Sequence, residues 1–144
     1  MITLNQYFGT KPHAPIHEQA ALELLERVGK LTDEAIAEGA FQRAMDPDTG
    51  TEISGSRGGT GDGGYRMNTS ITGKPGSAHK EGKGVDVYDP ADRLDLWIHK
   101  FEDGKGGNTK LAQYDLYREH MDDTPGWCHL QTRSPASGRR TFKP

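Results

Sequence analysis

The sequence predicts an α+β domain with a small antiparallel sheet and flanking helices. Two observations indicate this class. Residues 15–45 carry apolar side chains at helical spacing, and two short segments later in the chain alternate apolar and polar residues as strands do. The chain has 144 residues, the length of one domain. We therefore expect one unit over residues 1–144, with a helical part at 15–45 and a second part at 53–144 that carries the candidate functional residues.

The first expected element is an amphipathic helix from Ile16 to about Met45. Gly29 and Thr32 suggest that this helix is broken into a pair, because Thr32 can cap a second helix whose first turn is acidic. One helix and a broken pair both fit the pattern. The apolar residues recur near every 3.6 positions: Ala20, Leu24, Val28, Leu31, Ile36, Ala40, Phe41 and Ala44.

The rest of the chain is expected to combine one long irregular segment with short elements. Residues 51–84 are rich in glycine and poor in large apolar side chains, which is typical of loops around a functional site. The elements expected after it are a strand at 85–88, a helix at 91–100, a helix from 109 to about 120 and a strand at 127–132.

The composition indicates a soluble domain with a small core. Only 32% of the residues are hydrophobic, and the formal net charge of -3 argues against nucleic acid as a partner. No segment approaches the ~20 apolar residues of a membrane span, and the N-terminus does not read as a signal peptide. We expect a protein that is cytoplasmic as synthesised, is not inserted in a membrane and is monomeric. Its single cysteine, Cys128, excludes an intrachain disulfide, which leaves a metal ion as the staple for a loop-rich domain.

Three residues are candidate metal ligands: His79, Asp86 and His129. Alternation along the two expected strands turns Asp86 and His129 away from their apolar neighbours, so both face one cleft if the strands pair. Glycines between His79 and Asp86 allow a tight turn that brings these two side chains together. Two imidazoles and one carboxylate form a common ligand set for catalytic zinc, with one position left for water. Cys128 has the chemistry of a fourth ligand, but the same alternation directs it to the other face.

The motif that contains these residues resembles the signature of the zinc D-alanyl-D-alanine peptidases. It reads SxHxxGxxxD from Ser77 to Asp86 and is followed by WxH at 127–129, and the match extends over residues 53–144. This family includes VanX-type dipeptidases and phage endolysins and shares its fold with the hedgehog signalling domain. The segments after Asp86 and after residue 126 look closest to small phage-encoded members. The resemblance implies a hedgehog-like zinc domain with Zn²⁺ bound by His79, Asp86 and His129.

The resemblance also implies residues that bind the substrate. The family has a substrate-orienting arginine upstream of the SxH motif, and both Arg66 and Arg57 lie there. A planar guanidinium suits a substrate carboxylate because it can donate two parallel hydrogen bonds. Ser77 of the motif is expected to contribute to the same site.

The catalytic carboxylate of the family is harder to assign. Many members place an acid or a histidine a few residues before the last ligand, but the third residue before His129 is glycine here. Asp123 is the nearest acid, Asp122 and Glu119 are rivals, and His120 is a substitute base.

The resemblance predicts a zinc peptidase that acts on the peptides of bacterial peptidoglycan, as a D-Ala-D-Ala carboxypeptidase or an L-Ala endopeptidase. A phage would use such an enzyme for lysis or wall penetration, so we expect action on the cell wall after release or as part of a virion. The absent acid near His129 motivates one alternative, a non-catalytic zinc-stabilised binding or virion module. In a further alternative the chain is a structural protein that binds no metal.

Overall fold

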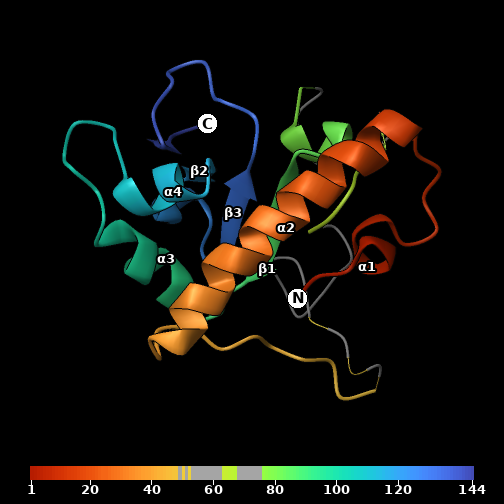
Figure 1. Ribbon diagram of the computed structural model, residues 1–144, viewed down its shortest axis with the longest axis horizontal. Helices are drawn as coiled ribbons and strands as arrows, with labels where there is room; N and C mark the ends of the chain where they lie inside the picture. Colours follow the sequence, from red (N-terminus) through yellow and green to blue (C-terminus); the bar gives the residue numbers. More distant parts are fainter. Residues whose placement is uncertain (49, 51, 53–62, 68–75) are drawn as a thin grey trace.

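The computed structural model describes residues 1–48, 50, 52, 63–67 and 76–144. They form an α+β arrangement with two main helices and a four-stranded mixed open sheet (Figure 1). The α+β class expected from the sequence is confirmed. The sheet differs from the expected purely antiparallel one because its fourth strand runs parallel to its neighbour.

The N-terminal part forms two helices, α1 (Leu4–Phe8) and α2 (Pro15–Ala37). Helix α2 begins at a proline, which is favoured in the first turn because an N–H there would have no partner within the helix. One side of α2 is buried and holds the apolar residues whose spacing predicted it. The buried residues are Ala21, Leu24, Leu25, Val28, Gly29, Leu31, Thr32 and Ala35.

The expected break in this helix is wrong, because α2 runs through Gly29 and Thr32 without interruption. The Thr32 hydroxyl group donates to the carbonyl oxygens of Val28 at 2.9 Å and Gly29 at 3.1 Å. It therefore bonds back to the preceding turn of the same helix and does not cap a second one.

Helix α2 also ends eight residues before the expected Met45. Gly39 has a φ of 73°, and the Ala40 amide donates to the carbonyl oxygen of Ala35 at 2.9 Å. This is the common termination in which a left-handed glycine follows the last helical turn. The helix therefore ends before Gly39. The apolar residues that follow at 40–44 continue the helical spacing, which is why the sequence predicted a longer helix.

The sheet has the strand order β1-β3-β2-β4. Strand β3 is antiparallel to both β1 and β2, and β4 is parallel to β2. The two strands expected from the sequence and their pairing are confirmed as β1 and β3, whereas β2 and β4 were not predicted. The bounds are β1 Gly84–Tyr88, β2 Tyr117–Glu119, β3 Trp127–Gln131 and β4 Thr141–Phe142.

The short helices partly follow the sequence pattern. Helix α3 (Arg93–His99) confirms the helix expected at 91–100, but α4 (Thr109–Gln113) ends well before residue 120. Asp115 has a φ of 50°, which stops α4 and turns the chain into β2. Two 3₁₀ turns complete the fold: η1 (Ala78–Glu81) precedes β1, and η2 (Met121–Asp123) precedes β3.

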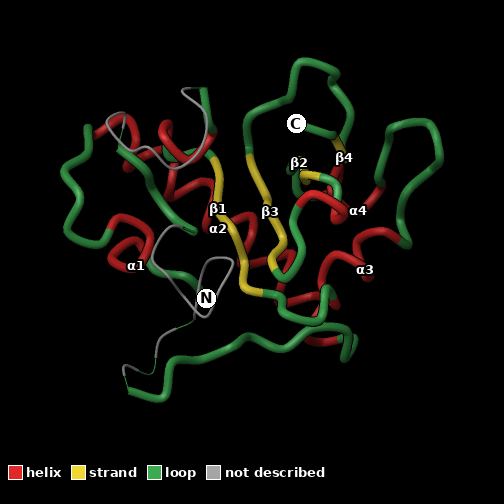
Figure 2. The backbone as a smooth tube through the Cα atoms, turned by 180° about the vertical axis from the view of Figure 1, so that it is seen from behind, coloured by secondary structure: helices red, strands yellow, loops and turns green. Residues whose placement is uncertain are grey.

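The sheet separates the core from the candidate site. Helix α2 crosses one face of the sheet (Figure 1), and in the view from behind β1 and β3 lie side by side in front of it (Figure 2). The apolar side chains of β1 and β3 point toward the core, namely Val85, Val87, Cys128 and Leu130. The side chains on the opposite face of these strands include Asp86, Trp127, His129 and Gln131, which line the candidate site.

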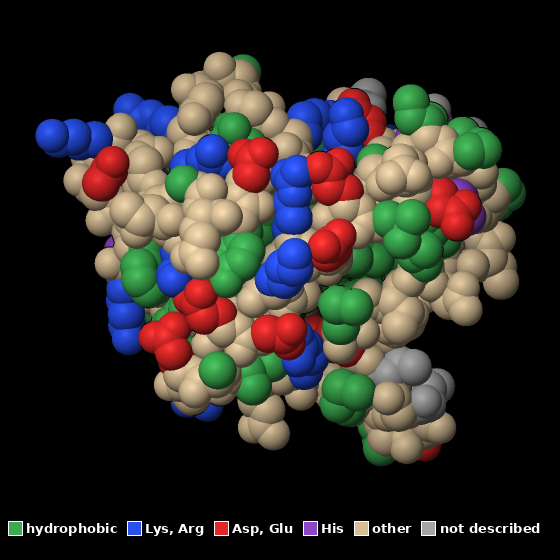
Figure 3. All heavy atoms as spheres, viewed as in Figure 1, with side chains coloured by type: hydrophobic (Ala, Val, Ile, Leu, Met, Phe, Trp, Pro, Cys, Tyr) green, Lys and Arg blue, Asp and Glu red, His purple; other side chains and the backbone are tan. Residues whose placement is uncertain are grey.

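The outer surface of α2 carries charges of both signs. On the face shown in Figure 3, Lys and Arg side chains alternate with Asp and Glu side chains. The pairs Glu23 with Arg27 and Glu26 with Lys30 are spaced four residues apart, which favours contact along a helix. In the part of the chain that the structure describes, no helix is long and apolar enough to cross a membrane.

A buried ion-pair cluster lies beneath β2. The Arg118 side chain is fully buried and donates to Asp95 Oδ1 at 2.9 Å and to Glu102 Oε1 at 3.0 Å. Burial raises the pKa of Asp95 to about 6, against the opposing effect of the Arg118 charge. The cluster ties β2 to α3 and to the segment after it, which keeps β2 in the sheet.

We predict that Arg118→Met destabilises the protein by about 3–5 kcal/mol, because it leaves two carboxylates without their cation in the interior. Denaturant unfolding monitored by circular dichroism measures this change. Arg139→Met, at an exposed arginine, is the matched control and should change stability by less than about 0.5 kcal/mol. Equal stability of the two variants would contradict a structural role for the cluster.

Candidate metal centre

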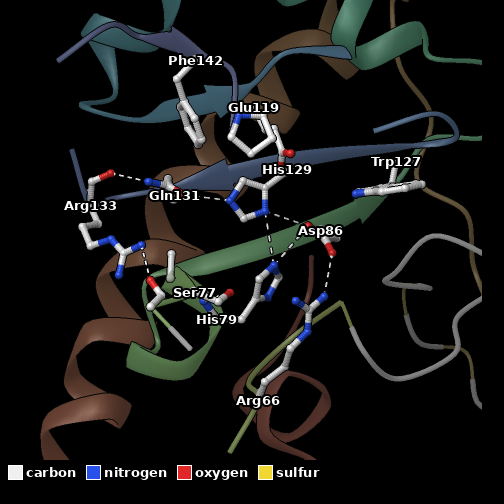
Figure 4. Close-up of a pocket in the computed structure, with 13 residues that line it drawn as sticks. Arg66, Ser77, His79, Asp86, Glu119, Trp127, His129, Gln131, Arg133 and Phe142 are labelled. Atoms are coloured by element: carbon white, nitrogen blue, oxygen red, sulfur yellow. Dashed lines mark hydrogen bonds and ion pairs between the residues drawn. The ribbon is translucent and has the colours of Figure 1, made fainter. Parts of the chain in front are cut away.

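The three side chains predicted as metal ligands meet at one point (Figure 4). His129 Nδ1 lies 2.8 Å from Asp86 Oδ1 and 3.2 Å from His79 Nε2, and the remaining His79–Asp86 distance is 3.3 Å. All three residues are buried, with 3–6% of each exposed. Bonds of about 2.0–2.1 Å to a tetrahedral zinc ion separate two ligand atoms by about 3.3–3.4 Å. A small expansion of this triangle therefore fits Zn²⁺.

The outward nitrogens of both imidazoles already have partners. His79 Nδ1 lies 2.8 Å from the carbonyl oxygen of Gly64, and His129 Nε2 lies 2.9 Å from Gln131 Oε1. Both partners are oxygens that only accept, so these nitrogens carry the ring protons when the rings are neutral. The lone pairs of His79 Nε2 and His129 Nδ1 then face inward, as metal ligands require.

The electrostatics of the group also favour a cation. Burial alone would raise the pKa of the Asp86 carboxyl, but the charge of His79 and the hydrogen bonds from His129 and His79 hold it below its usual range. Burial lowers the pKa of His79. Burial also acts to lower the pKa of His129, but the hydrogen bond and charge of Asp86, together with Gln131 and Glu119, raise it overall. In the structure, protons on the imidazoles balance the Asp86 carboxylate. A metal ion held by the three side chains would replace those protons and leave both inward nitrogens as ligands.

The turn before β1 places His79 and Asp86 together. Ser77 caps η1 by accepting a hydrogen bond from the His79 amide at 3.3 Å, and Gly82 ends η1 with a φ of 73°. A Cβ atom on Gly84 would lie 3.1 Å from Cε1 of His129. The two glycines therefore serve the tight turn expected from the sequence, one by its conformation and the other by its small size.

Residues 63–66 form a main-chain brace, a segment whose backbone hydrogen-bonds to the two ligand residues Asp86 and His79. The Gly63 carbonyl oxygen accepts from the Asp86 amide at 2.7 Å, and the Gly64 carbonyl oxygen accepts from His79 Nδ1. The amide of Arg66 donates to the carbonyl oxygen of His79 at 3.2 Å. This brace was not predicted, because main-chain contacts to a glycine-rich segment leave no pattern in the sequence.

Helix α1 holds the brace in place. The Tyr65 amide donates to the carbonyl oxygen of Tyr7 at 2.8 Å, and the Tyr7 hydroxyl group donates to the carbonyl oxygen of Gly84 at 2.8 Å. A Cβ atom on Gly64 would lie 2.3 Å from the Tyr7 carbonyl oxygen. The N-terminal segment thus packs directly behind the ligand set.

The ligand set forms part of the wall of a pocket of about 480 Å³. Arg66 and Ser77 both line it, and Arg66 Nη2 lies 3.4 Å from Asp86 Oδ2 (Figure 4). Arg57, the other candidate arginine, lies outside the described residues. Apolar and polar side chains share the remaining wall, among them Trp127, Gln131, Arg133 and Phe142.

Of the three candidate catalytic acids, the structure brings Glu119 to this pocket. The register of β2 with β3, continued by one residue, sets Glu119 beside His129, and its charge contributes to the raised pKa of His129. Asp122 and Asp123 are exposed on η2 and are not part of the described pocket wall. The His120 ring lies beside Asp122, with 3.4 Å from Nδ1 to the carboxylate.

Within the described part of the chain, no fourth histidine, cysteine or carboxylate joins the three ligand atoms. Cys128 is fully buried in the core on the opposite side of β3, as strand alternation predicted. A metal ion held by His79, Asp86 and His129 would therefore have three protein ligands among the described residues.

A second group of acids, Asp89, Asp92 and Asp95, also lies close together. Each of the three carboxylates already has a partner in the fold. The Asp89 carboxylate accepts 2.9 Å hydrogen bonds from the amides of Arg93 and Leu94 at the start of α3. Asp92 accepts from a main-chain amide, and Asp95 pairs with the buried arginine of β2. This group is structural.

Comparison of the chain with protein-family models, curated proteins and solved structures found no match. The functional assignment therefore depends on the geometry of the site. That geometry is a buried His79–Asp86–His129 group that could hold a metal ion, within a small α+β domain.

We predict that the purified, untagged protein binds about one zinc ion per chain and that His79→Ala lowers both zinc content and melting temperature. Zinc at a thousand times its Kd stabilises the folded state by about 4 kcal/mol, provided that only this state binds it. Elemental analysis and thermal unfolding measure the two effects. His99→Ala, at an exposed histidine on α3, is the control and should keep the full zinc content. Equal zinc content in the two variants would contradict the assigned site.

We predict that Gly64→Ala weakens zinc binding and destabilises the protein by about 1–3 kcal/mol, because the added methyl group cannot fit against Tyr7 without moving the brace. Gly76→Ala is the matched control, since nothing lies within 4 Å of a Cβ atom at that position. Calorimetric zinc titration and denaturant unfolding of both variants test this expectation. A Gly64→Ala protein that binds zinc as tightly as the control would show that the brace does not support the ligands.

Proposed function

We propose that this protein is a zinc peptidase that hydrolyses peptide bonds of bacterial peptidoglycan. One observation carries the proposal: a buried His–Asp–His group opens on a pocket that also contains Glu119 and Arg66. Such a pocket combines a metal site, a base and a carboxylate-binding cation, the three parts that peptide hydrolysis by a zinc enzyme needs. The resemblance of the SxHxxGxxxD and WxH motifs to the zinc D-alanyl-D-alanine peptidases supports the substrate class and a hedgehog-like fold.

Glu119 is the residue that we assign as general base. When bound at His79, Asp86 and His129, zinc lowers the pKa of a water molecule toward ~7 and polarises the scissile carbonyl group. The Glu119 carboxylate can accept the proton of the attacking water and deliver it to the leaving amine. Its position beside His129 supports this role, and the exposed positions of Asp122 and Asp123 make them weaker candidates.

Arg66 is the residue that we assign to a carboxylate of the substrate. Its side chain is 13% exposed and lies against Asp86, so one end of the guanidinium group is oriented toward the metal ligands. A guanidinium in the pocket wall can donate to a terminal or side-chain carboxylate of the peptide. This contact would hold the scissile bond at a fixed distance from the metal site.

The biological setting follows from the same proposal. Both cleavage of a D-Ala-D-Ala bond and cleavage after L-alanine are compatible with the pocket. We propose a phage-encoded monomer that acts on the cell wall, either after release from the cytoplasm or from a virion, without a nucleic-acid or membrane partner.

The alternative to a peptidase is a non-catalytic zinc module. It was suggested by the glycine that stands where the motif normally has an acid before His129. Glu119, on the strand next to His129, places an acid in the pocket from another part of the chain. A purely structural zinc site also normally has four protein ligands.

We predict that the zinc-loaded protein releases new amino groups from purified peptidoglycan and that a chelator abolishes this release. Glu119→Gln should lower kcat by about 10²–10⁴-fold, because it removes the base, while one zinc ion per chain is retained. Glu38→Gln, at an exposed glutamate just after α2, is the matched control and should keep full activity. Mass spectrometry of the released peptides identifies the bond that is cleaved.

Two results would contradict these assignments. Absence of released amines from the zinc-loaded protein, with a known peptidoglycan hydrolase active on the same substrate, would refute the peptidase. A larger loss of kcat in Asp123→Asn than in Glu119→Gln would transfer the role of base to Asp123.

A further inference from the structure

We infer that Gln131 is a positioning residue that orients the His129 imidazole for metal binding. This inference rests on the metal centre of the proposed function and adds a residue to it. Gln131 is 4% exposed and lies two positions after His129 on β3, so both side chains lie on the same face of the strand. Its Oε1 atom is 2.9 Å from His129 Nε2 (Figure 4).

The orientation of the Gln131 amide follows from a second contact. Its Nε2 atom donates to the carbonyl oxygen of Arg133 at 2.6 Å. The amide nitrogen can donate to that carbonyl and the amide oxygen cannot, so Oε1 must point toward His129. An oxygen at that place accepts a hydrogen bond from the N–H group at Nε2 of the imidazole, which leaves the lone pair on Nδ1 for a metal ion.

Arg133 is itself tied to the segment that carries the other histidine ligand. Its guanidinium group donates to Glu81 Oε1 at 2.9 Å and to the carbonyl oxygen of Gly76 at 2.6 Å. Glu81 belongs to η1, which also contains His79. The chain of contacts from His129 through Gln131 and Arg133 therefore links the end of β3 to η1 and fixes the two imidazoles relative to one another.

The two histidine ligands differ in the kind of group that orients them. A main-chain carbonyl, that of Gly64, accepts from His79 Nδ1, whereas a side-chain oxygen accepts from His129 Nε2. Partners that orient a metal-binding histidine typically change metal affinity by about 10–100-fold when they are removed. Because the partner of His129 is a side chain, one substitution at Gln131 removes the orienting contact and leaves all three metal ligands unchanged.

The test compares two replacements of Gln131. Gln131→Met keeps the length and apolar volume of the side chain but has no acceptor, and it should weaken zinc binding by about 10–100-fold. Gln131→Glu keeps an oxygen acceptor for His129 but loses the donor to the Arg133 carbonyl, so it should bind zinc more tightly than Gln131→Met. Gln113→Met, the same replacement at the exposed last residue of α4, is the control and should leave zinc affinity unchanged. Zinc affinity is measured by competition with a chromogenic chelator.

A spectrum separates orientation from simple packing. With Co²⁺ in place of zinc, the visible absorption bands report the ligand geometry. We expect these bands to change in Gln131→Met and to be preserved in Gln131→Glu, while the metal-free forms of both variants unfold cooperatively.

Three results would overturn the inference. Unchanged zinc affinity in Gln131→Met would show that His129 needs no orienting partner. Equal weakening in Gln131→Met and Gln131→Glu would show that Gln131 does not act through the oxygen that faces His129. Failure of the unchanged protein to bind zinc would refute the metal centre, and with it the proposed function.

Discussion

The pairing of Asp86 with His129 across β1 and β3 is the contact on which the rest of the site depends. Side chains alternate along a strand, so a shift of one strand by one residue would turn its ligand toward the core and away from the other ligand. The register is secured by apolar partners on the other face, where Val85 lies opposite Leu130 and Val87 opposite Cys128. The same few residues therefore build the core and aim the ligands. This coupling explains how five-residue strands can define a metal site.

The sequence allowed the ligands to be predicted because their placement depends on local periodicity. His79 and Asp86 lie within one motif, and His129 lies within a strand whose alternation is visible. Glu119 was only one of three rivals, since β2 has three residues and β4 has two, too few to show a period. Strand β2 also contains a charged residue, Arg118, whose burial depends on acids elsewhere in the chain. The helix expected to continue to residue 120 ends at Gln113, because the tertiary contacts of β2 outweigh the helical spacing of the apolar residues.

The N-terminal helices have a larger part in the site than their sequence indicated. Apolar spacing predicted α2 as a cover for the core, and it does cover one face of the sheet. The contacts of Tyr7 with Tyr65 and with Gly84 go further, because they fix the segment that orients His79. None of these hydrogen bonds depends on a recognisable motif: each has a main-chain group at one or both ends. Sequence reasoning finds side chains with distinctive chemistry and misses supports made by the backbone.

The distance along the chain between the two histidine ligands has a kinetic consequence. His79 and His129 are 50 residues apart, and an ion shared between them would act as a reversible cross-link between η1 and β3. Separation of these elements would require dissociation of the ion first, so local opening around the central strands would slow to the rate of metal release. Resistance to proteolysis would then depend on how slowly the ion leaves, more than on the equilibrium stability of the domain.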